Sequence, residues 1–331
     1  MASLRGEGRL ARLAGLLDPR EPILVQTHDY PDIDAVASAW ALAELLARRG
    51  FRSSIAHRGE IRSRSLARLV AELGIELPAA PPAEACPGRE IVVVDGSPAN
   101  GNVGLFPGRL VGIVDHHCKA GEPEAPFIDI RPELASASTM IFGYWEEAGE
   151  VPPRGIATAL LAGLQSDTDF LSRRSSAEDF RAYAALFDLG DWERASRVVR
   201  TVLDLRELDL IARAISGARV EEGLLYASLE GRCGQEALAV AADFALRAEE
   251  LRACVVADRD DAGFHFSIRS KSPRLSAFDL ARRALEGIGS GGGHSHSAGG
   301  SVPAAGAPPE GELSSRFFAA SAALWAEGRL E

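Results

Sequence analysis

Three short segments decide the fold of this chain: PILVQTHDYPDID (22–34), IVVVDGS (91–97) and LVGIVDHH (110–117). Each segment opens with a run of mostly apolar residues and closes with aspartate, histidine or a turn that contains them. Strands that are apolar along their whole length are typical of parallel sheets, because helices cover both faces of such sheets. The three segments therefore predict an α/β fold whose parallel sheet has helices on both faces.

Helical patterns flank and follow these strands. Apolar residues recur at helical spacing from about Asp34 to Arg49, and Gly50 then provides a stop signal. Further helices are expected at residues 65–73, 138–148, 154–164, 177–189 and 193–218. The last of these is rich in charged residues, and we expect it to carry the chain from one domain to the next.

At about residue 222 the sequence pattern changes from long helical stretches to short runs that are typical of strands. Strands are expected for LLYASL (224–229), ACVVAD (253–258) and FHFSIRS (264–270), and a glycine loop for SGGGHSHSAGG (290–300). A chain of 331 residues is also long for one hydrophobic core. We therefore expect an N-terminal domain over residues 1–200, a helical linker over 201–221 and a smaller C-terminal α/β domain over 222–331.

The bulk composition narrows the classes of partner. The chain has 36 Lys and Arg against 47 Asp and Glu, a net charge of −11, whereas proteins that coat long nucleic acids are basic. No apolar run approaches the roughly 18 residues needed to span a membrane. The four cysteines are too scattered for a zinc knuckle or a disulfide scaffold. We therefore expect a cytoplasmic protein without a membrane partner and without a long nucleic acid bound along it.

The polar residues at the strand ends point to a common site. His28, Asp95 and Asp115 each follow an apolar strand, and the ligand crevice of an open parallel sheet lies outside the carboxyl ends of its strands. Asp32 and Asp34 stand two residues apart in the segment after His28, close enough to serve adjacent ions. On local grounds alone, Asp34 also fits a helix N-cap and Asp95 a turn.

Further candidates extend this set. His116 and His117 follow Asp115 directly, and three adjacent ionisable groups after a buried strand are costly to desolvate without cations or partners. Asp167 follows an apolar helical stretch, with Asp169 two residues on. Carboxylates favour Mg²⁺ and Mn²⁺, and imidazoles shift the preference toward Mn²⁺ or another transition ion. Two ions roughly 3.5–4 Å apart clamp the attacking and leaving oxygens of a phosphoryl displacement, so the set predicts a two-metal phosphoesterase.

The same residues resemble the motifs of a known family. HDYPDIDAVAS (28–38), VVVDGS (92–97), VDHH (114–117) and GLQSDTDF (163–170) resemble, in order and spacing, the four motifs of the DHH phosphoesterase superfamily. Downstream, FHFSIRS and GGGHSHSAGG resemble the DHH-associated C-terminal domain. The resemblance covers most of the chain. It implies a DHH catalytic domain followed by a substrate-binding domain.

The resemblance also implies roles for individual residues. It assigns His28 and Asp32 to one cation, Asp34, His116 and Asp167 to a second, and Asp95 to a bridge between the two. The two divalent cations are expected to be Mn²⁺, with Mg²⁺ or Co²⁺ as alternatives. Two further residues are implied to be catalytic: Asp115 supports the ligand set and His117 approaches the substrate phosphoryl group. The expected nucleophile is a metal-bound water.

Four residues of the C-terminal domain are implied to bind substrate. Arg269 matches a phosphate-gripping arginine, and Gly292, Gly293 and His294 match a loop that helps to hold the substrate. Glycines independently allow backbone N–H groups to converge on an anion. By composition alone, this segment also fits a flexible linker.

The layout resembles the oligoribonuclease and bisphosphate-nucleotide phosphatase branch. We therefore expect hydrolysis of short oligonucleotides and of adenosine 3′,5′-bisphosphate. The alternatives are a cyclic-dinucleotide phosphodiesterase, an inorganic pyrophosphatase or a non-catalytic nucleotide-binding relative; the last usually has a broken ligand set, whereas here every position is filled. A short oligonucleotide or a small phosphorylated nucleotide is thus the expected partner, and a homodimer is left open.

Overall fold

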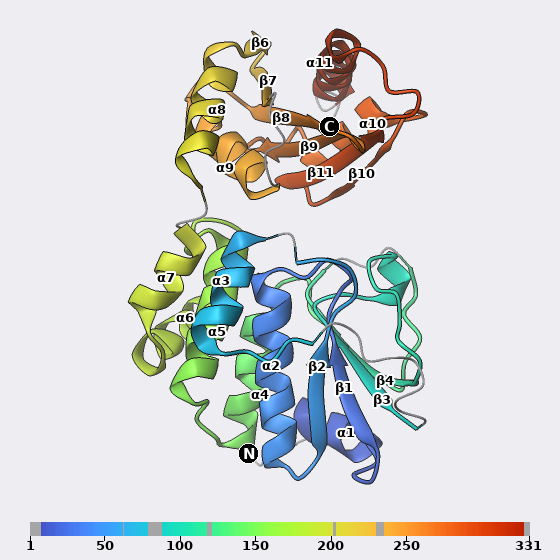
Figure 1. Cartoon of the computed structure of the whole chain (residues 1–331), viewed down its shortest axis with the longest axis vertical. Coiled ribbons are helices and arrows are strands. Elements are labelled where there is room, and N and C mark those ends of the chain that lie inside the picture. The colour runs from blue at the N-terminus through green and yellow to red at the C-terminus, as the bar shows by residue number, and fades with distance from the viewer. Residues whose placement is uncertain are drawn as a thin grey trace. The chain divides into compact units, whose positions relative to one another are not determined.

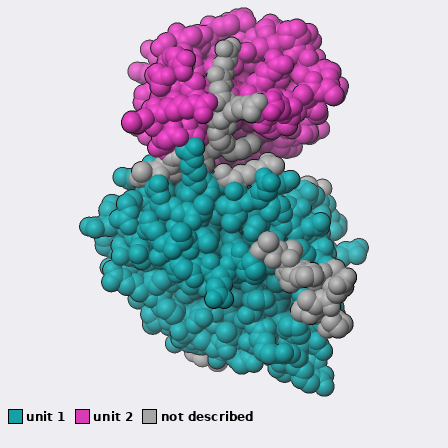
Figure 2. All heavy atoms as spheres, in the orientation of Figure 1, with its two compact units in different colours: residues 1–201 teal, residues 202–331 magenta. Residues whose placement is uncertain are grey.

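The computed structural model describes residues 8–61, 63–78, 88–117, 121–200, 203–229 and 235–327. The chain divides into two compact units, Met1–Thr201 and Val202–Glu331 (Figure 2). Each unit has its own sheet and its own apolar core. The architecture confirms the predicted α/β class, with a parallel sheet in the N-terminal part and a smaller α/β unit after it.

The sheet of the first unit has five parallel strands (Figure 1). In sheet order they are β2 (Arg52–Ala56), β1 (Pro22–Gln26), β3 (Glu90–Val94), β4 (Arg109–Asp115) and β5 (Phe127–Ile130). All five residues of β3 are buried, as are residues 111–115 of β4. This burial is the physical reason for the continuous apolar runs in the sequence.

The helices of the first unit contribute to one apolar cluster on one face of that sheet. They are α1 (Arg9–Leu16), α2 (Ile33–Arg48), α3 (Arg64–Leu73), α4 (Ala137–Ala148), α5 (Arg154–Thr168), α6 (Ala177–Leu189) and α7 (Trp192–Arg200). The opposite face carries a smaller cluster, covered by Val103 and Phe106, which follow the short 3₁₀ helix η2 (Pro98–Asn100). Within the described residues, the expectation of helices on both faces is therefore met on one face only.

The second unit has a six-stranded mixed sheet. Its order is β10 (Ser290–Gly293), β11 (Ser297–Pro303), β9 (Gly263–Ser270), β8 (Ala253–Asp260), β7 (Leu224–Leu229) and β6 (Arg219–Glu221). Only β7 and β8 run parallel. One face packs against α10 (Ala277–Leu285) and α11 (Glu310–Glu327), and the other against α8 (Leu205–Ser216) and α9 (Gln235–Ala245).

Two segments differ from the sequence-based expectation. The single helix expected at 193–218 is two helices, α7 and α8. Asp204 caps α8: its side chain accepts a hydrogen bond from the Glu207 N–H, and the Glu207 side chain accepts one from the Asp204 N–H. The expected glycine loop is instead the β10–β11 hairpin. A Cβ on Gly291 would lie 2.8 Å from the Ala281 Cβ, so the glycine allows the hairpin to lie close against α10.

Three of the four cysteines lie outside the described residues. Cys254 is buried in β8 with a free thiol. Among the described helices, none is both long enough and apolar enough to cross a lipid bilayer.

Candidate metal centre

The carboxyl ends of three adjacent strands supply most of the candidate ligands. His28 lies two residues beyond β1, Asp95 follows β3 directly, and Asp115 is the last residue of β4, with His116 next to it. Because β1, β3 and β4 are neighbours and parallel, these side chains meet at one edge of the sheet. The structure thus brings together residues that are far apart in the sequence.

A first group of potential ligands contains His28, Asp32 and Asp95, whose ligand atoms lie within 4.8 Å of one another. The His28 Nε2 lies 3.9 Å from Asp32 Oδ2 and 3.8 Å from Asp95 Oδ2. Asp32 is also the N-cap of α2, where its Oδ1 accepts a hydrogen bond from the Ala35 N–H. The cap of this helix is therefore Asp32, and Asp34 lies inside the first turn.

A second group contains Asp34, His116 and Asp167, again with ligand atoms within 4.8 Å. The His116 Nε2 lies 3.9 Å from Asp34 Oδ2 and 3.4 Å from Asp167 Oδ2. Asp167 reaches the site from near the end of α5. Asp169, two residues further along, is the C-cap of that helix and is not part of either group.

Asp95 stands between the two groups. Its Oδ2 faces His28, whereas its Oδ1 lies 3.2 Å from the His116 Nε2. Asp95 has a positive φ of 61°, a conformation that aspartate, asparagine and glycine tolerate better than most residues. A Cβ on the next residue, Gly96, would lie 2.9 Å from a Val103 methyl carbon. The turn after β3 therefore needs glycine there to hold Asp95 in place.

Asp34 is fixed by a contact that the sequence does not reveal. Its two carboxylate oxygens accept hydrogen bonds from the Ala137 N–H (2.6 Å) and the Ser138 N–H (2.9 Å) at the start of α4. Gly163 of α5 packs against the same carboxylate, since a Cβ there would lie 2.7 Å from Asp34 Oδ1. A glycine inside a helix is a sequence signal for close packing, and it could have pointed to this residue.

Two carboxyl groups of this site, those of Asp34 and Asp167, have raised pKa values. Burial, followed by the charge of Asp95, raises the pKa of Asp34 to about 7. Burial and the charges of Asp34 and Asp32 also raise the pKa of Asp167 well above its ordinary range. Several carboxylates at this spacing repel one another in a buried site, and divalent cations between them remove that repulsion.

Buried polar atoms without hydrogen-bond partners indicate whether the residues of this site fit metal ions. Asp95 Oδ1 and both ring nitrogens of His116 are buried and have no hydrogen-bond partner among the described residues. Such atoms are rare in folded proteins unless a ligand serves them. The set of carboxylate oxygens with two imidazoles suits Mn²⁺ and related ions. The residues therefore fit divalent cations, which Asp95 and the two groups of ligands would hold.

His117 forms a third such group with Asp95 and His116, and Asp115 holds its side chain. Its Nδ1 lies 2.8 Å from Asp115 Oδ1, and its backbone N–H donates to the same oxygen at 3.1 Å. Although burial opposes it, the hydrogen bond that His117 donates to Asp115 raises the pKa of His117 to about 9. Asn100, which the sequence did not single out, donates to Asp115 Oδ2 at 3.5 Å. It lies in the 3₁₀ helix after the Asp95 turn, and no pattern in the sequence marks it.

The four residues expected to bind substrate lie in the second unit. Arg269 of β9 is mostly buried, and its Nε donates to Asp243 Oδ1 at 2.8 Å. His294 follows β10, and its ring stacks on His296 with centroids 5.8 Å apart. Gly293 has a φ of 137°, and a Cβ there would lie 2.5 Å from the Ser297 carbonyl oxygen. A Cβ on Gly292 would meet no heavy atom within 4 Å, so packing does not require glycine at that position.

Comparisons with other proteins identify both units. The DHH family N-terminal domain matches residues 22–164, and the DHHA1 domain matches residues 221–314. An uncharacterised protein of Methanocaldococcus jannaschii is 31% identical over 287 residues, which are 86% of this chain and 59% of that protein. A probable manganese-dependent inorganic pyrophosphatase of Streptococcus mutans is 27% identical over 214 residues, 60% of this chain and 68% of that protein. The chain thus spans about three fifths of the archaeal relative's length.

Solved structures show the same fold. An exopolyphosphatase-related protein from Bacteroides fragilis superposes with a TM-score of 0.73 at 18% identity, covering 93% of this chain and 94% of that chain. The RecJ protein of Thermus thermophilus in complex with Mn²⁺ superposes with a TM-score of 0.53 at 18% identity, covering 98% of this chain and 54% of that chain. The two matched domains, in this order, make the chain a member of the DHH superfamily, in which relatives such as RecJ and the pyrophosphatases are metal-dependent hydrolases.

Proposed function

We propose that this protein is a two-metal phosphoesterase that hydrolyses short oligonucleotides and adenosine 3′,5′-bisphosphate. The observation that carries the hydrolytic part is the position of Asp95, whose two oxygens face two separate groups of ligands. His28 and Asp32 would hold one cation, and Asp34, His116 and Asp167 the other. Bound there, two divalent cations activate water and neutralise charge on the phosphoryl group.

The exposure of the side chains at this site indicates the side from which a substrate would approach. His117 is 29% exposed, whereas the His116 and Asp95 side chains are almost completely buried. The hydrogen bond that His117 donates from Nδ1 to Asp115 Oδ1 fixes the orientation of its imidazole. His117 would thus bind the phosphoryl group from the solvent side, and Asp115 would orient the ring. Asn100 supports Asp115 in turn.

The substrate class is supported by the second unit and by the relatives. Arg269 carries a charge that suits phosphate, and the open space at Gly292 allows a ligand to approach the backbone. RecJ, named an exonuclease among the solved structures, shares this fold and binds manganese. The net charge of −11 favours a short substrate over a long nucleic acid. Mn²⁺ is the cation that we propose, with Mg²⁺ and Co²⁺ as alternatives.

A pyrophosphatase is the second candidate, because a probable manganese-dependent inorganic pyrophosphatase is among the sequence relatives. That reaction would favour a clamp of lysine and arginine side chains over the GGGH turn (291–294). A cyclic-dinucleotide phosphodiesterase is a third candidate with the same metal chemistry.

A substrate panel separates these candidates. The purified chain is assayed with Mn²⁺, Mg²⁺ and Co²⁺ on di- to pentanucleotides, adenosine 3′,5′-bisphosphate, cyclic dinucleotides and pyrophosphate. We expect turnover of the first two classes, highest with Mn²⁺. The variant Asp188→Ala, which changes an exposed aspartate of α6, serves as a matched control with unchanged rates. Fast hydrolysis of pyrophosphate or of a cyclic dinucleotide, together with inert oligonucleotides and bisphosphate, would reject the proposal.

A further inference from the structure

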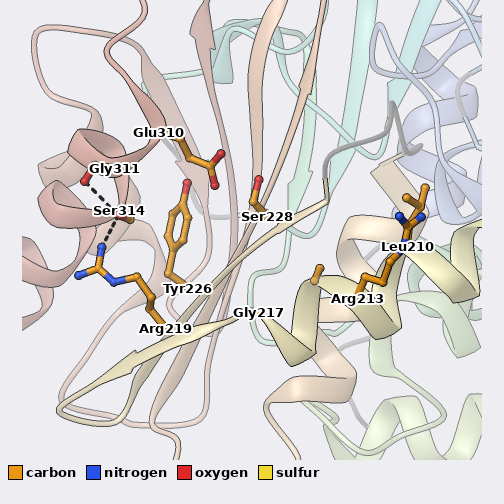
Figure 3. Close-up of a pocket in the computed structure, with 10 residues that line it drawn as sticks. Leu210, Arg213, Gly217, Arg219, Tyr226, Ser228, Glu310, Gly311 and Ser314 are labelled. Carbon is orange, nitrogen blue, oxygen red and sulfur yellow. Dashed lines mark hydrogen bonds between the residues drawn. The ribbon is translucent and has the colours of Figure 1, made fainter.

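A cavity of about 560 Å³ lies within the second unit, away from the residues expected to bind substrate there. It is bordered by the end of α8, strands β6 and β7, and the start of α11 (Figure 3). In the sheet, β6 and β7 occupy the edge opposite to β10, next to which His294 lies. Its volume falls within the range of roughly 300–1,000 Å³ that is typical of small-ligand sites.

A buried hydroxyl with no partner points into this cavity. Tyr226 of β7 is 4% exposed, and its hydroxyl has no hydrogen-bond partner among the described residues. The ring is fixed by Phe317 and Phe318 of α11, with centroids at 6.0 and 6.5 Å. A buried hydroxyl without a partner destabilises a fold by about 1–3 kcal/mol, so its presence needs a reason. A ligand that accepts its hydrogen bond provides one.

A carboxylate lies next to that hydroxyl. Glu310, the first residue of α11, lines the cavity, and its charge acts on Tyr226. In the described part of the chain, no hydrogen bond or ion pair engages this carboxylate. Figure 3 shows the Tyr226 hydroxyl and the Glu310 carboxylate turned toward the same space, with the Ser228 hydroxyl beyond them. The cavity therefore offers a donor beside an acceptor.

The position of the Tyr226 donor beside the Glu310 acceptor indicates which ligand would fit the cavity. Burial, followed by the charge of Glu310, raises the pKa of Tyr226, so the phenol keeps its proton and donates. A carboxylate only accepts, and it can accept two parallel N–H groups. Guanine carries a carbonyl oxygen next to a ring N–H and an amino group, which is the complementary order. Adenine and cytosine place one amino group beside a ring nitrogen, so each would leave one carboxylate oxygen without a donor.

The lining also holds positive charge for a phosphate. Arg213 of α8 and Arg219 of β6 line the cavity, and both side chains are about half exposed or more; Arg213 forms an exposed ion pair with Asp209 (2.8 Å). Arg219 is kept in place by Ser314 and Glu221. Leu210 and Ala214 supply an apolar wall for a flat base. We propose that this cavity binds a guanine nucleotide, whose base is recognised by Tyr226 and Glu310, at a site separate from the metal centre.

The test uses the full-length chain and guanosine 5′-monophosphate (GMP) as the probe. Calorimetric titration in EDTA is expected to show saturable GMP binding, with AMP and CMP at least about tenfold weaker, the equivalent of one charged hydrogen bond. The same binding is expected in an Asp95→Asn variant, which changes only the metal centre. Absence of GMP binding, equal binding of the three nucleotides, or loss of binding in Asp95→Asn would overturn the proposal.

Three variants locate the site. Glu310→Gln is expected to weaken GMP binding about tenfold, whereas Glu312→Gln, an exposed residue in the same turn of α11, leaves it unchanged. Tyr226→Phe is expected to remove the thermal shift produced by GMP without lowering the melting temperature of the free protein, because the hydroxyl has no partner to lose. Equal effects of the two glutamate variants, or an unchanged GMP shift in Tyr226→Phe, would refute the assignment.

Discussion

The candidate metal centre has a buried half and an open half. In the buried half, the side chains of Asp34 and His116 are 0% and 1% exposed. In the open half, those of His28 and Asp32 are 16% and 52% exposed. Asp167, the third member of the buried half, is 21% exposed. The difference teaches that one cation would lie deeper in the protein, whereas the other would lie nearer to water and substrate.

The two halves also differ in how their ligands are held. Asp34 is fixed by two backbone N–H groups of α4, and Gly163 of α5 packs against it. Asp32 caps α2 through one oxygen, and its other oxygen lies 3.9 Å from the His28 Nε2. Ligands that are held by other parts of the protein bind metal more tightly, because less order has to be created on binding. We therefore expect tight binding in the buried half and exchange in the open half.

Breaking the bridge should have the largest effect. Asp95→Asn keeps a residue that tolerates the positive φ but removes the charge between the two groups. We expect kcat to fall on the order of 10³-fold or more, the scale seen when a group that stabilises transition-state charge is lost. Metal content, measured by mass spectrometry, should fall from two ions per chain. A variant with unchanged turnover would instead favour a binding protein that does not use this centre.

Removing one histidine from each half separates the two cations. We expect His28→Ala to lower activity at micromolar Mn²⁺ and to recover at millimolar Mn²⁺, because its cation exchanges with solvent. We expect His116→Ala to stay inactive across that range and to lose thermal stability. Activity against Mn²⁺ concentration measures the difference. If both variants recover equally, the two halves are equivalent and the comparison fails.

Adding one methyl group at Gly163 tests whether packing of α5 holds Asp34 in the buried half. In Gly163→Ala the new Cβ would lie 2.3 Å from Ser138 Oγ and 2.7 Å from Asp34 Oδ1. Displacement of Asp34 should weaken metal binding about 10- to 100-fold, the usual effect of disturbing a ligand's support. Gly143→Ala is the control, since its Cβ would meet nothing within 4 Å; it should stabilise α4 by roughly 0.5–1 kcal/mol. Equal metal affinity in the two variants would contradict the packing argument.

The smallest effect is expected at Asn100. Asn100→Ala removes one hydrogen bond to Asp115 and should loosen His117, lowering kcat about fivefold for a bond of ~1 kcal/mol. Metal content and KM should not change, because this hydrogen bond goes to Asp115, which is not a proposed ligand of either cation. Steady-state kinetics at saturating Mn²⁺ provide the measurement. A loss of metal instead of kcat would assign Asn100 to the ligand set.

Much of the fold could be predicted because its signals are local. Short apolar runs mark the strands of the first unit, and a helical pattern with a cap marks helix α6. The structure confirms the α/β class. The break between α7 and α8 was missed because Asp204 and its partner Glu207 lie within an otherwise helical pattern. The hairpin of β10 and β11 was missed because glycines signal loops, whereas here they permit close contact with α10.

The candidate site shows the same division. The expected ligands are those that the structure gathers into two groups, because aspartate and histidine after an apolar strand are visible in the sequence. The contacts that fix them are long-range: Asp34 meets Ala137 and Ser138 from more than one hundred positions away. Asn100 and Tyr226 carry no motif. Their importance depends on which groups they face, and only the folded chain decides that.

The repulsion between the carboxylates around Asp95 has a consequence for the stability of the folded protein. A ligand that binds only the folded state stabilises it by about 2.7 kcal/mol when present at one hundred times its Kd. Metal supply would therefore set how long the first unit survives proteolysis as well as how fast it works.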